Sequence, residues 1–306
     1  MTKIKDVSAQ VSNIILGKQR QIQLALACLI ARGHLLIEDV PGVGKTTLAH
    51  ALAASLGLNF HRIQFTSDLL PADVLGVAVY NSDRSKFEFH PGPIFSQVVL
   101  ADEINRATPK AQSALLEAME EHQVTIEGET RRLPEPFFVI ATQNPSHQIG
   151  TFPLPESQLD RFLMRIELGY PDPDAERALL RGEDRRDLLQ RMTPCMQPDE
   201  LLALQREAQQ VHVSDALLDY VQALVGHTRR SADYVSGLSP RAALALTQAA
   251  RAWALLDTRK HVVPEDVQAV LPGVVGHRLS TTGSARETTA TSADVAARLI
   301  QSVAIP

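Results

Sequence analysis

The sequence predicts an α/β fold, a parallel five-stranded sheet flanked by helices, followed by a second domain built only of helices. Three observations carry this prediction. Short apolar segments alternate with stretches of helical periodicity over the first part of the chain, which is typical of a parallel sheet covered on both faces. Strand-like segments then stop after Gly169. A glycine-rich turn, EDVPGVGKTT at residues 38–47, connects the first strand candidate directly to a helix.

Five strands are expected because each is a short apolar run bounded by polar residues or turn signals. They span His34 to Glu38, Phe60 to Phe65, Val98 to Ala101, Phe137 to Ala141 and Phe162 to Leu168. Helices are expected between them, since Leu48, Leu52 and Leu56 recur at helical spacing. Thr108 followed by Pro109 is typical of a helix start. Ligands of such a sheet bind at the carboxyl ends of its strands.

The domain division is predicted from a linker and two insertions. YPDPDAE at residues 170–176 carries two prolines and three acidic residues, which indicates a linker. The chain is therefore divided into an α/β domain, residues 1–171, and a linker plus helical domain, residues 172–306. Residues 77–89 and 123–133 show strand-like alternation around a polar turn, and are expected to be hairpins inserted into the first domain.

The composition limits the function classes. A formal net charge of -5 provides no global basic field, so nucleic acid is not an expected partner. Cys28 and Cys195 cannot form a disulfide framework, which favours a reducing cytoplasm. The N-terminus lacks the apolar region of a signal peptide, and the longest apolar run, residues 24–31, is shorter than the roughly 20 residues of a membrane span. We therefore expect a cytoplasmic protein without a membrane span.

Residues 38–47 are expected to bind a phosphate. Gly42 and Gly44 let the backbone curl so that several N–H groups converge on an anion. Lys45 adds positive charge, and a helix beginning at Lys45 or Thr46 adds unpaired N–H groups and the positive end of its dipole. The hydroxyl of Thr46 suits Mg²⁺. The expected binding residues are Pro41, Gly42, Val43, Gly44, Lys45, Thr46 and Thr47.

One position departs from the usual pattern of such a loop, G-x-x-x-x-G-K-[ST]. Asp39 occupies the place of the first glycine. Its carboxylate must point away from a bound polyanion, because like charges repel at short distance. The alternative interpretation of this segment is a glycine-rich turn with an exposed lysine.

Polar side chains follow two of the buried strand candidates. Asp102 and Glu103 come directly after VVLA, and one carboxylate can hold Mg²⁺ through water while its neighbour polarises an attacking water. If the loop at residues 38–47 holds a triphosphate, Asn144, which comes after the strand candidate that ends at Ala141, can hold the water or the γ-phosphate. The alternatives are a strand that merely ends in acidic residues, and a turn formed by Asn144 and the proline after it.

Two arginines are candidates for contact with phosphate. Arg161 lies just before the fifth strand candidate and can reach the phosphates of a neighbouring copy, or else pairs with Asp160 on the surface. Arg241 follows Ser239 and Pro240, which predicts its place at a helix N-terminus. The helix dipole disfavours a cation there, so an anion such as the bound nucleotide would explain it. The alternative is a solvated arginine.

Taken together, these stretches resemble the AAA+ ATPases, and among them the MoxR-type family. The resemblance covers nearly the whole chain and rests on DVPGVGKTT, VVLADEINRA, ALLEAMEEHQVTIEG, VIATQNP, GTFPLPESQLDRF and GLSPRA, in the family's order and spacing. It implies a P-loop fold with a helical lid and a Walker A loop with Lys45 and Thr46. It also implies a Walker B strand with Asp102 as metal ligand and Glu103 as catalytic carboxylate.

The resemblance further implies sensor 1 at Asn144, an arginine finger at Arg161, sensor 2 at Arg241 and an adenine-side contact at Gly17. The implied cofactors are ATP and Mg²⁺. The implied activity is ATP hydrolysis at the subunit interfaces of a homo-oligomeric ring, expected to be hexameric. Hydrolysis would drive remodelling, assembly or activation of a client protein, often one with a von Willebrand factor A domain. The two hairpins are similar to substrate-engaging loops, although padding of an interface is equally open.

Two other classes of function remain open. A nucleic-acid motor shares the phosphate loop and the arginine finger, but it should carry basic hairpins or a winged-helix extension. Arg131 and Arg132 are the only basic pair on the second hairpin candidate. A nucleotide-gated scaffold without turnover is the other class, and the presence of Glu103 argues against it.

Overall fold

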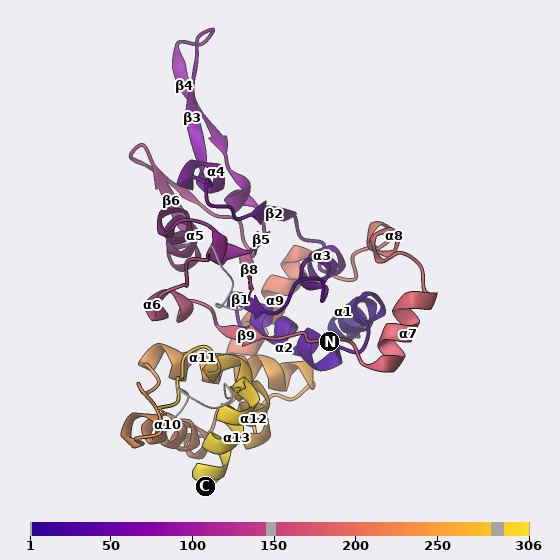
Figure 1. Cartoon of the computed structure of the whole chain (residues 1–306), viewed down its shortest axis with the longest axis vertical. Coiled ribbons are helices and arrows are strands. Elements are labelled where there is room, and N and C mark those ends of the chain that lie inside the picture. Colours follow the sequence, from indigo (N-terminus) through magenta and orange to yellow (C-terminus); the bar gives the residue numbers. More distant parts are fainter. Residues whose placement is uncertain (1, 145–150, 283–290, 306) are drawn as a thin grey trace.

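The computed structural model describes residues 2–144, 151–282 and 291–305. Its centre is a five-stranded sheet in the order β2-β5-β8-β1-β9, in which neighbouring strands are parallel. The strands are β1 (Leu35–Glu38), β2 (Phe60–Gln64), β5 (Val98–Asp102), β8 (Phe138–Gln143) and β9 (Met164–Ile166). All five expected strands are present, and the predicted parallel α/β sheet is confirmed (Figure 1).

The fifth strand is shorter than the predicted range of 162–168. At its start, the carbonyl of Phe162 accepts a hydrogen bond from Arg278 at 2.7 Å. At its end, the N–H of Leu168 donates to the Asp39 side chain at 2.7 Å. Side chains from elsewhere in the chain therefore form hydrogen bonds with the backbone groups that would otherwise extend the strand.

The central strands β5, β8 and β1 are buried on both faces, which explains why they are apolar along most of their length, whereas β2 at the edge carries exposed polar residues. Successive residues of β1 alternate between two hydrophobic cores: Leu35 and Ile37 belong to one, and Leu36 to the other. The first core is covered by α1 (Thr2–Ile14), α2 (Gln19–Ile30) and α3 (Lys45–Ser55). The second core is covered by α4 (Pro71–Leu75) and α5 (Pro109–Glu121), near the short helices η1 (Pro93–Phe95), η2 (Ile104–Arg106) and α6 (Glu156–Leu159).

After Gly169, the described residues form helices and two isolated β-bridges. The helices are α7 (Pro173–Arg181), α8 (Arg185–Gln190), α9 (Pro198–Gln209), α10 (Asp215–Arg230), α11 (Pro240–Leu256), α12 (Pro264–Val275) and α13 (Ser292–Ser302). Buried residues of α9 to α13 join the core that also contains α2, so the predicted helical lid is confirmed and packs tightly on the sheet domain. No helix in the described ranges combines the length and hydrophobicity that a bilayer span needs.

The first two helices after the sheet domain lie apart from the lid bundle. Figure 1 shows α7 and α8 beside α1 and α3, and α8 contacts both of these helices. Arg185 in α8 donates to the carbonyl of Asn13 at the end of α1, at 3.1 Å. Residues 173–190 thus wrap around the sheet domain before the chain enters the lid. The domain boundary after residue 171 stays a prediction.

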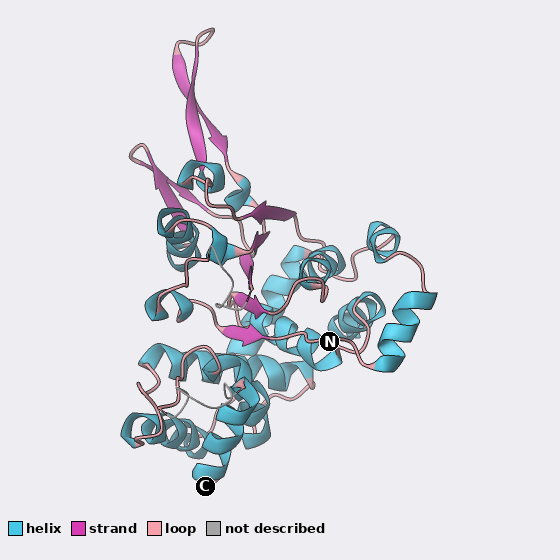
Figure 2. Ribbon diagram, viewed as in Figure 1, coloured by secondary structure: helices cyan, strands magenta, loops and turns pink. Residues whose placement is uncertain are grey.

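Two antiparallel hairpins project from one end of the sheet domain (Figure 2). They are β3 (Gly76–Asn81) with β4 (Lys86–Pro91), and β6 (Gln123–Ile126) with β7 (Glu129–Arg132). Tyr80 and Phe87 face each other across the first hairpin at 5.4 Å between ring centroids, and their exposed fractions are 55% and 66%. The Arg131 guanidinium lies 4.1 Å from the ring centroid of Phe89, so a cation–π contact joins the hairpins.

Candidate active site

The turn between β1 and α3 has the backbone of a phosphate-binding loop. Gly42 and Gly44 have φ angles of 86° and 97°, in the left-handed region that side chains disfavour. A Cβ atom on Gly42 would meet no heavy atom within 4 Å, so the backbone conformation rather than crowding requires glycine there. Helix α3 begins at Lys45, directly after the second glycine. The loop therefore presents bare backbone and a helix N-terminus, as an anion site requires.

The ammonium of Lys45 lies where this loop meets the end of β8. It donates to the carbonyls of Asp39 at 2.5 Å and Val40 at 2.9 Å, and lies 3.4 Å from Oδ1 of Asn144. Burial lowers the pKa of Lys45, and the nearby carboxylates, Asp39 first, oppose that shift. The side chain is not the exposed lysine of the alternative interpretation.

Asp102 is buried at the end of β5 and is bonded on both oxygens. Its Oδ1 accepts from the hydroxyl of Thr142 at 2.5 Å, and its Oδ2 lies 3.3 Å from the hydroxyl of Thr46. Arg62 on β2 also reaches Oδ2, at 2.7 Å. Thr46 and Asp102, which are 56 residues apart in the sequence, thus come together at the end of β5. Arg62 and Thr142 were not predicted.

Glu103 follows with a φ of 56°, a left-handed conformation that is uncommon and costly for a residue other than glycine. Its N–H donates to the hydroxyl of Thr142 at 2.8 Å, which holds the turn. One carboxylate oxygen accepts from Asn144 at 3.2 Å, and the other accepts from Gln64 at 3.1 Å. Arg106 also lies at 3.1 Å from the second oxygen. The carboxylate is therefore held beside Asn144 and close to the Lys45 ammonium.

The donor set fits Mg²⁺ and a nucleotide triphosphate. Magnesium prefers oxygen ligands and is usually bound by one or two protein groups together with phosphate oxygens. The Thr46 hydroxyl and the Asp102 carboxylate provide those protein oxygens. The loop backbone and the Lys45 ammonium provide the donors that a polyphosphate needs.

Two further predicted residues lie on the side of the loop that faces the linker. One oxygen of the Asp39 carboxylate, Oδ2, faces the linker and accepts from Leu168 N at 2.7 Å and Gly169 N at 2.6 Å, while Oδ1 accepts from the N–H of the neighbouring Val40. Gly17 has a φ of 70°, and a Cβ atom there would lie 2.9 Å from Oδ2 of Asp172. The predicted adenine-side residue thus lies against the linker that leads to the lid.

Arg161 and Arg241 lie together, away from the loop. Both bind Glu120 of α5: Arg161 at 3.1 Å, with a second bond to the Leu116 carbonyl at 2.6 Å, and Arg241 through the other carboxylate oxygen. Arg241 does begin a helix beside an anion, but that anion is Glu120. Arg161 does not pair with Asp160, because the Asp160 carboxylate pairs with Arg278 at 2.6 Å.

The two arginines and the phosphate loop lie at opposite edges of the sheet. The loop follows the carboxyl end of β1, whereas the arginines line a cavity of about 250 Å³ with Gly33 and His34, which precede β1. All strands are parallel, so the four residues of β1, at about 3.3 Å each, separate the edges by about 13 Å. Neither arginine is positioned to contact a nucleotide in the loop of its own chain.

Arg278 fixes this arrangement from the lid. Its side chain is only 5% exposed and donates to the carboxylate of Asp160 at 2.6 Å and to the carbonyl of Leu163 at 3.1 Å. Ser239, which caps α11 just before Arg241, also donates to Asp160, at 3.2 Å. Burial lowers the pKa of Arg278, and Asp160 opposes the shift. The lid thus holds the segment that carries Arg161.

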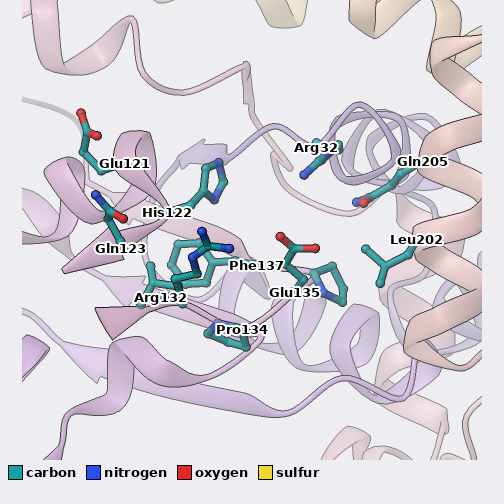
Figure 3. Close-up of a pocket in the computed structure, with 12 residues that line it drawn as sticks. Arg32, Glu121, His122, Gln123, Arg132, Pro134, Glu135, Phe137, Leu202 and Gln205 are labelled. Atoms are coloured by element: carbon teal, nitrogen blue, oxygen red, sulfur yellow. The ribbon is translucent and has the colours of Figure 1, made fainter. Parts of the chain in front are cut away.

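A second cavity of about 230 Å³ at the same edge is not a phosphate site. Figure 3 shows Arg32 and Arg132 on its walls together with Glu121 and Glu135. Two carboxylates offset two guanidinium groups, so no net positive charge is left to hold a polyanion.

The residues that sequence reasoning missed are polar partners from neighbouring strands and helices. Arg62 and Gln64 are the clearest case, because they alternate on one face of β2. That alternation is a signal in the sequence. Its meaning depends on β2 lying next to β5, which places Gln64 opposite Asp102.

This fold and this site define a P-loop ATPase with an AAA+ core and a helical lid. Residues 34–164 match the ATPase family associated with various cellular activities (AAA), and residues 226–299 match the AAA lid domain. A crystal structure of a proposed ATPase from Cytophaga hutchinsonii is similar, with a TM-score of 0.88 and 37% identity over 100% of this chain and 95% of that chain.

The particular family is shown by its relatives. Chaperone MoxR1 of Mycobacterium tuberculosis is 41% identical, with 97% of this chain and 81% of that protein covered. Protein MoxR of Paracoccus denitrificans is 33% identical over 90% of this chain and 88% of its own length. The uncharacterised protein YeaC of Bacillus subtilis is 48% identical over 88% of this chain and 84% of its own length. The chain belongs to the MoxR-type family of AAA+ ATPases.

Proposed function

We propose that the protein hydrolyses ATP with Mg²⁺ at the interfaces between copies of its chain in a ring, which we expect to contain six copies. We further propose that hydrolysis drives remodelling, assembly or activation of a client protein. The observation that carries the proposal is the position of Glu103, whose carboxylate accepts from Asn144 at 3.2 Å while Lys45 lies 3.4 Å from the same side-chain amide. A base, a polar group that orients water and a phosphate-binding cation are thus joined in one cluster.

The proposed roles follow from the chemistry of each side chain. Bound Mg²⁺ would neutralise charge on the β- and γ-phosphates, and Thr46 and Asp102 would hold it. Lys45 and the loop N–H groups bind the phosphates. Glu103 polarises the attacking water and accepts its proton, and Asn144 orients that water.

Arg161 and Arg241 complete the site from the neighbouring copy. Their place at the amino edge of the sheet supports this role, because a head-to-tail contact brings that edge of one chain to the loop of the next. Glu120 holds both side chains as a pair, so one incoming phosphate group would meet two guanidinium groups. We therefore assign Arg241, like Arg161, to the neighbour's nucleotide.

The client is proposed to be a protein with a von Willebrand factor A domain, as the family resemblance implies. The name of the related Chaperone MoxR1 supports a chaperone-like role. The exposed Tyr80 and Phe87 on the first hairpin offer an apolar contact for it. Cys28 and Cys195 are both free, which is compatible with the cytoplasm we propose.

The test is ATPase activity of the purified chain with Mg²⁺. Glu103→Gln should still bind nucleotide, while turnover falls by about a hundredfold or more, because the shape stays and the base is lost. Lys45→Ala should differ by weakening nucleotide binding itself, since it removes a contact already present in the ground state. Wild-type turnover in Glu103→Gln would refute the assignment.

The same assay separates the other function classes. Turnover that is indifferent to DNA favours protein remodelling, and turnover stimulated by DNA would indicate a nucleic-acid motor. Tight nucleotide binding by the wild type without any turnover would indicate a nucleotide-gated scaffold.

A further inference from the structure

Asp39, the residue that departs from the usual loop pattern, contacts both the phosphate loop and the start of the linker. Its carboxylate accepts the N–H groups of Leu168 and Gly169, and its other oxygen accepts the N–H of Val40 at 2.8 Å. Bonds from N–H groups to a charged acceptor are among the stronger hydrogen bonds in proteins. A glycine at this position would make none of the three.

The backbone of Asp39 contacts the phosphate-binding lysine. Its carbonyl accepts from the Lys45 ammonium at 2.5 Å. A phosphate in the loop competes with this carbonyl for the ammonium, because the phosphate carries the larger negative charge. Phosphate binding therefore changes the surroundings of the residue that also holds Leu168 and Gly169.

The linker has the features of a hinge at this point. Gly169 has a φ of 64°, and no heavy atom lies within 4 Å of a Cβ built on it, so its conformation rather than its packing requires glycine. The next carbonyl, of Tyr170, accepts from Lys18 at 2.7 Å. Asp172 lies against Gly17, the predicted adenine-side residue. Residues 168–172 thus pass from the phosphate loop to the adenine side of the site.

We propose that Asp39 is a positioning residue that couples phosphate binding in the loop to the order of the hinge at residues 168–172. The inference rests on the nucleotide binding of the proposed function, and it requires neither hydrolysis nor a ring. Asp39 itself does not contact the phosphate, since its carboxylate faces the hinge.

The experiment measures hydrogen exchange of the hinge amides with and without a non-hydrolysable ATP analogue and Mg²⁺. In the wild type, the analogue should change exchange at Leu168 and Gly169. In Asp39→Gly, basal exchange should rise by about tenfold or more, since two bonds to a charged acceptor are lost. The decisive result is that the analogue no longer changes hinge exchange in this variant, although its affinity stays within about threefold, because glycine suits the loop.

Asp39→Asn and Glu167→Gln sharpen the test. Asp39→Asn keeps an oxygen acceptor without the charge, so the change that the analogue causes in hinge exchange should be intermediate. This variant also keeps the inference testable if Asp39→Gly folds poorly. Glu167→Gln is the matched control: it removes one negative charge next to the hinge and leaves the bonds from Leu168 and Gly169 to Asp39 in place. The analogue should change its hinge exchange as it does in the wild type.

Three outcomes overturn the inference. The first is a full hinge response in Asp39→Gly. The second is loss of analogue binding in that variant, which would place the contribution of the carboxylate inside the loop. The third is a wild type that binds the analogue without any change at the hinge. A wild type that binds no analogue at all would instead refute the proposed function.

Discussion

A mixture of two inactive variants tests whether the arginine edge of one copy completes the loop of another. Arg161→Ala keeps an intact phosphate loop, and Lys45→Ala keeps an intact arginine. Each variant alone should be nearly inactive. Arg161→Ala loses an arginine finger, which contributes about a thousandfold or more to phosphoryl transfer, and Lys45→Ala loses a contact that binds the phosphates. Mixed rings should regain hydrolysis, since some interfaces pair the intact loop with the intact arginine.

The expected recovery follows from the opposite positions of the two sites. The edges lie about 13 Å apart along β1, so one interface uses the loop of one chain and the arginine of the other. In randomly mixed rings with equal amounts of both variants, half of the loops and half of the arginines are intact. About a quarter of the interfaces then have both, and turnover should approach about a quarter of the wild-type value if interfaces act independently.

The assay is steady-state phosphate release, with native mass spectrometry to show that mixed rings form. A mixture of wild type with each variant is the control for poisoning of a ring by one defective copy. If mixed rings form and the mixture releases no more phosphate than the separate variants, Arg161 does not act across the interface and the reasoning from the two edges is wrong.

Two further predictions concern the stability of the fold. Arg278→Ala should lower the free energy of unfolding by about 2–3 kcal/mol. The loss is smaller than for a fully buried ion pair, because the Asp160 side chain is 22% exposed. An unchanged denaturation midpoint would contradict this prediction. Burial lowers the pKa of His34 from 6.5 to about 4, so below pH 6.5 the unfolded chain takes a proton that the folded chain refuses. The free energy of unfolding should therefore fall as the pH drops from 6.5 to about 4. The fall should be shallower in His34→Asn, which keeps an acceptor for the Val139 N–H. Equal slopes of melting temperature against pH in the two proteins would exclude this role of His34.

The centre of the sheet could be predicted because β1, β5 and β8 are buried on both faces. Runs such as VVLA and FFVIA have no polar face, and only helices on either side satisfy them. The boundary of β9 could not be predicted, since it depends on Arg278, more than a hundred residues away in the sequence. A periodicity argument has no access to such a contact.

The candidate site could be predicted where its residues follow a loop or the end of a strand in the sequence. It could not be predicted where a contact depends on which strands or helices are neighbours in space. Thr46 and Asp102 approach each other because the carboxyl ends of parallel strands meet at one edge. The contact of Arg241 with Glu120 was not predicted, because the two residues lie 121 positions apart in the sequence. The roles of these residues in catalysis stay predictions.

The placement of the loop and the arginines on opposite edges gives an assembly of this chain a polarity. In the proposed head-to-tail assembly, every copy would offer its arginines in one direction and receive them from the other, so a pair of copies would contain a single complete site. An open row always ends in one copy whose loop has no donor, and only closure of the ring removes that incomplete end. Activity per chain should consequently rise with concentration and level off when the rings close.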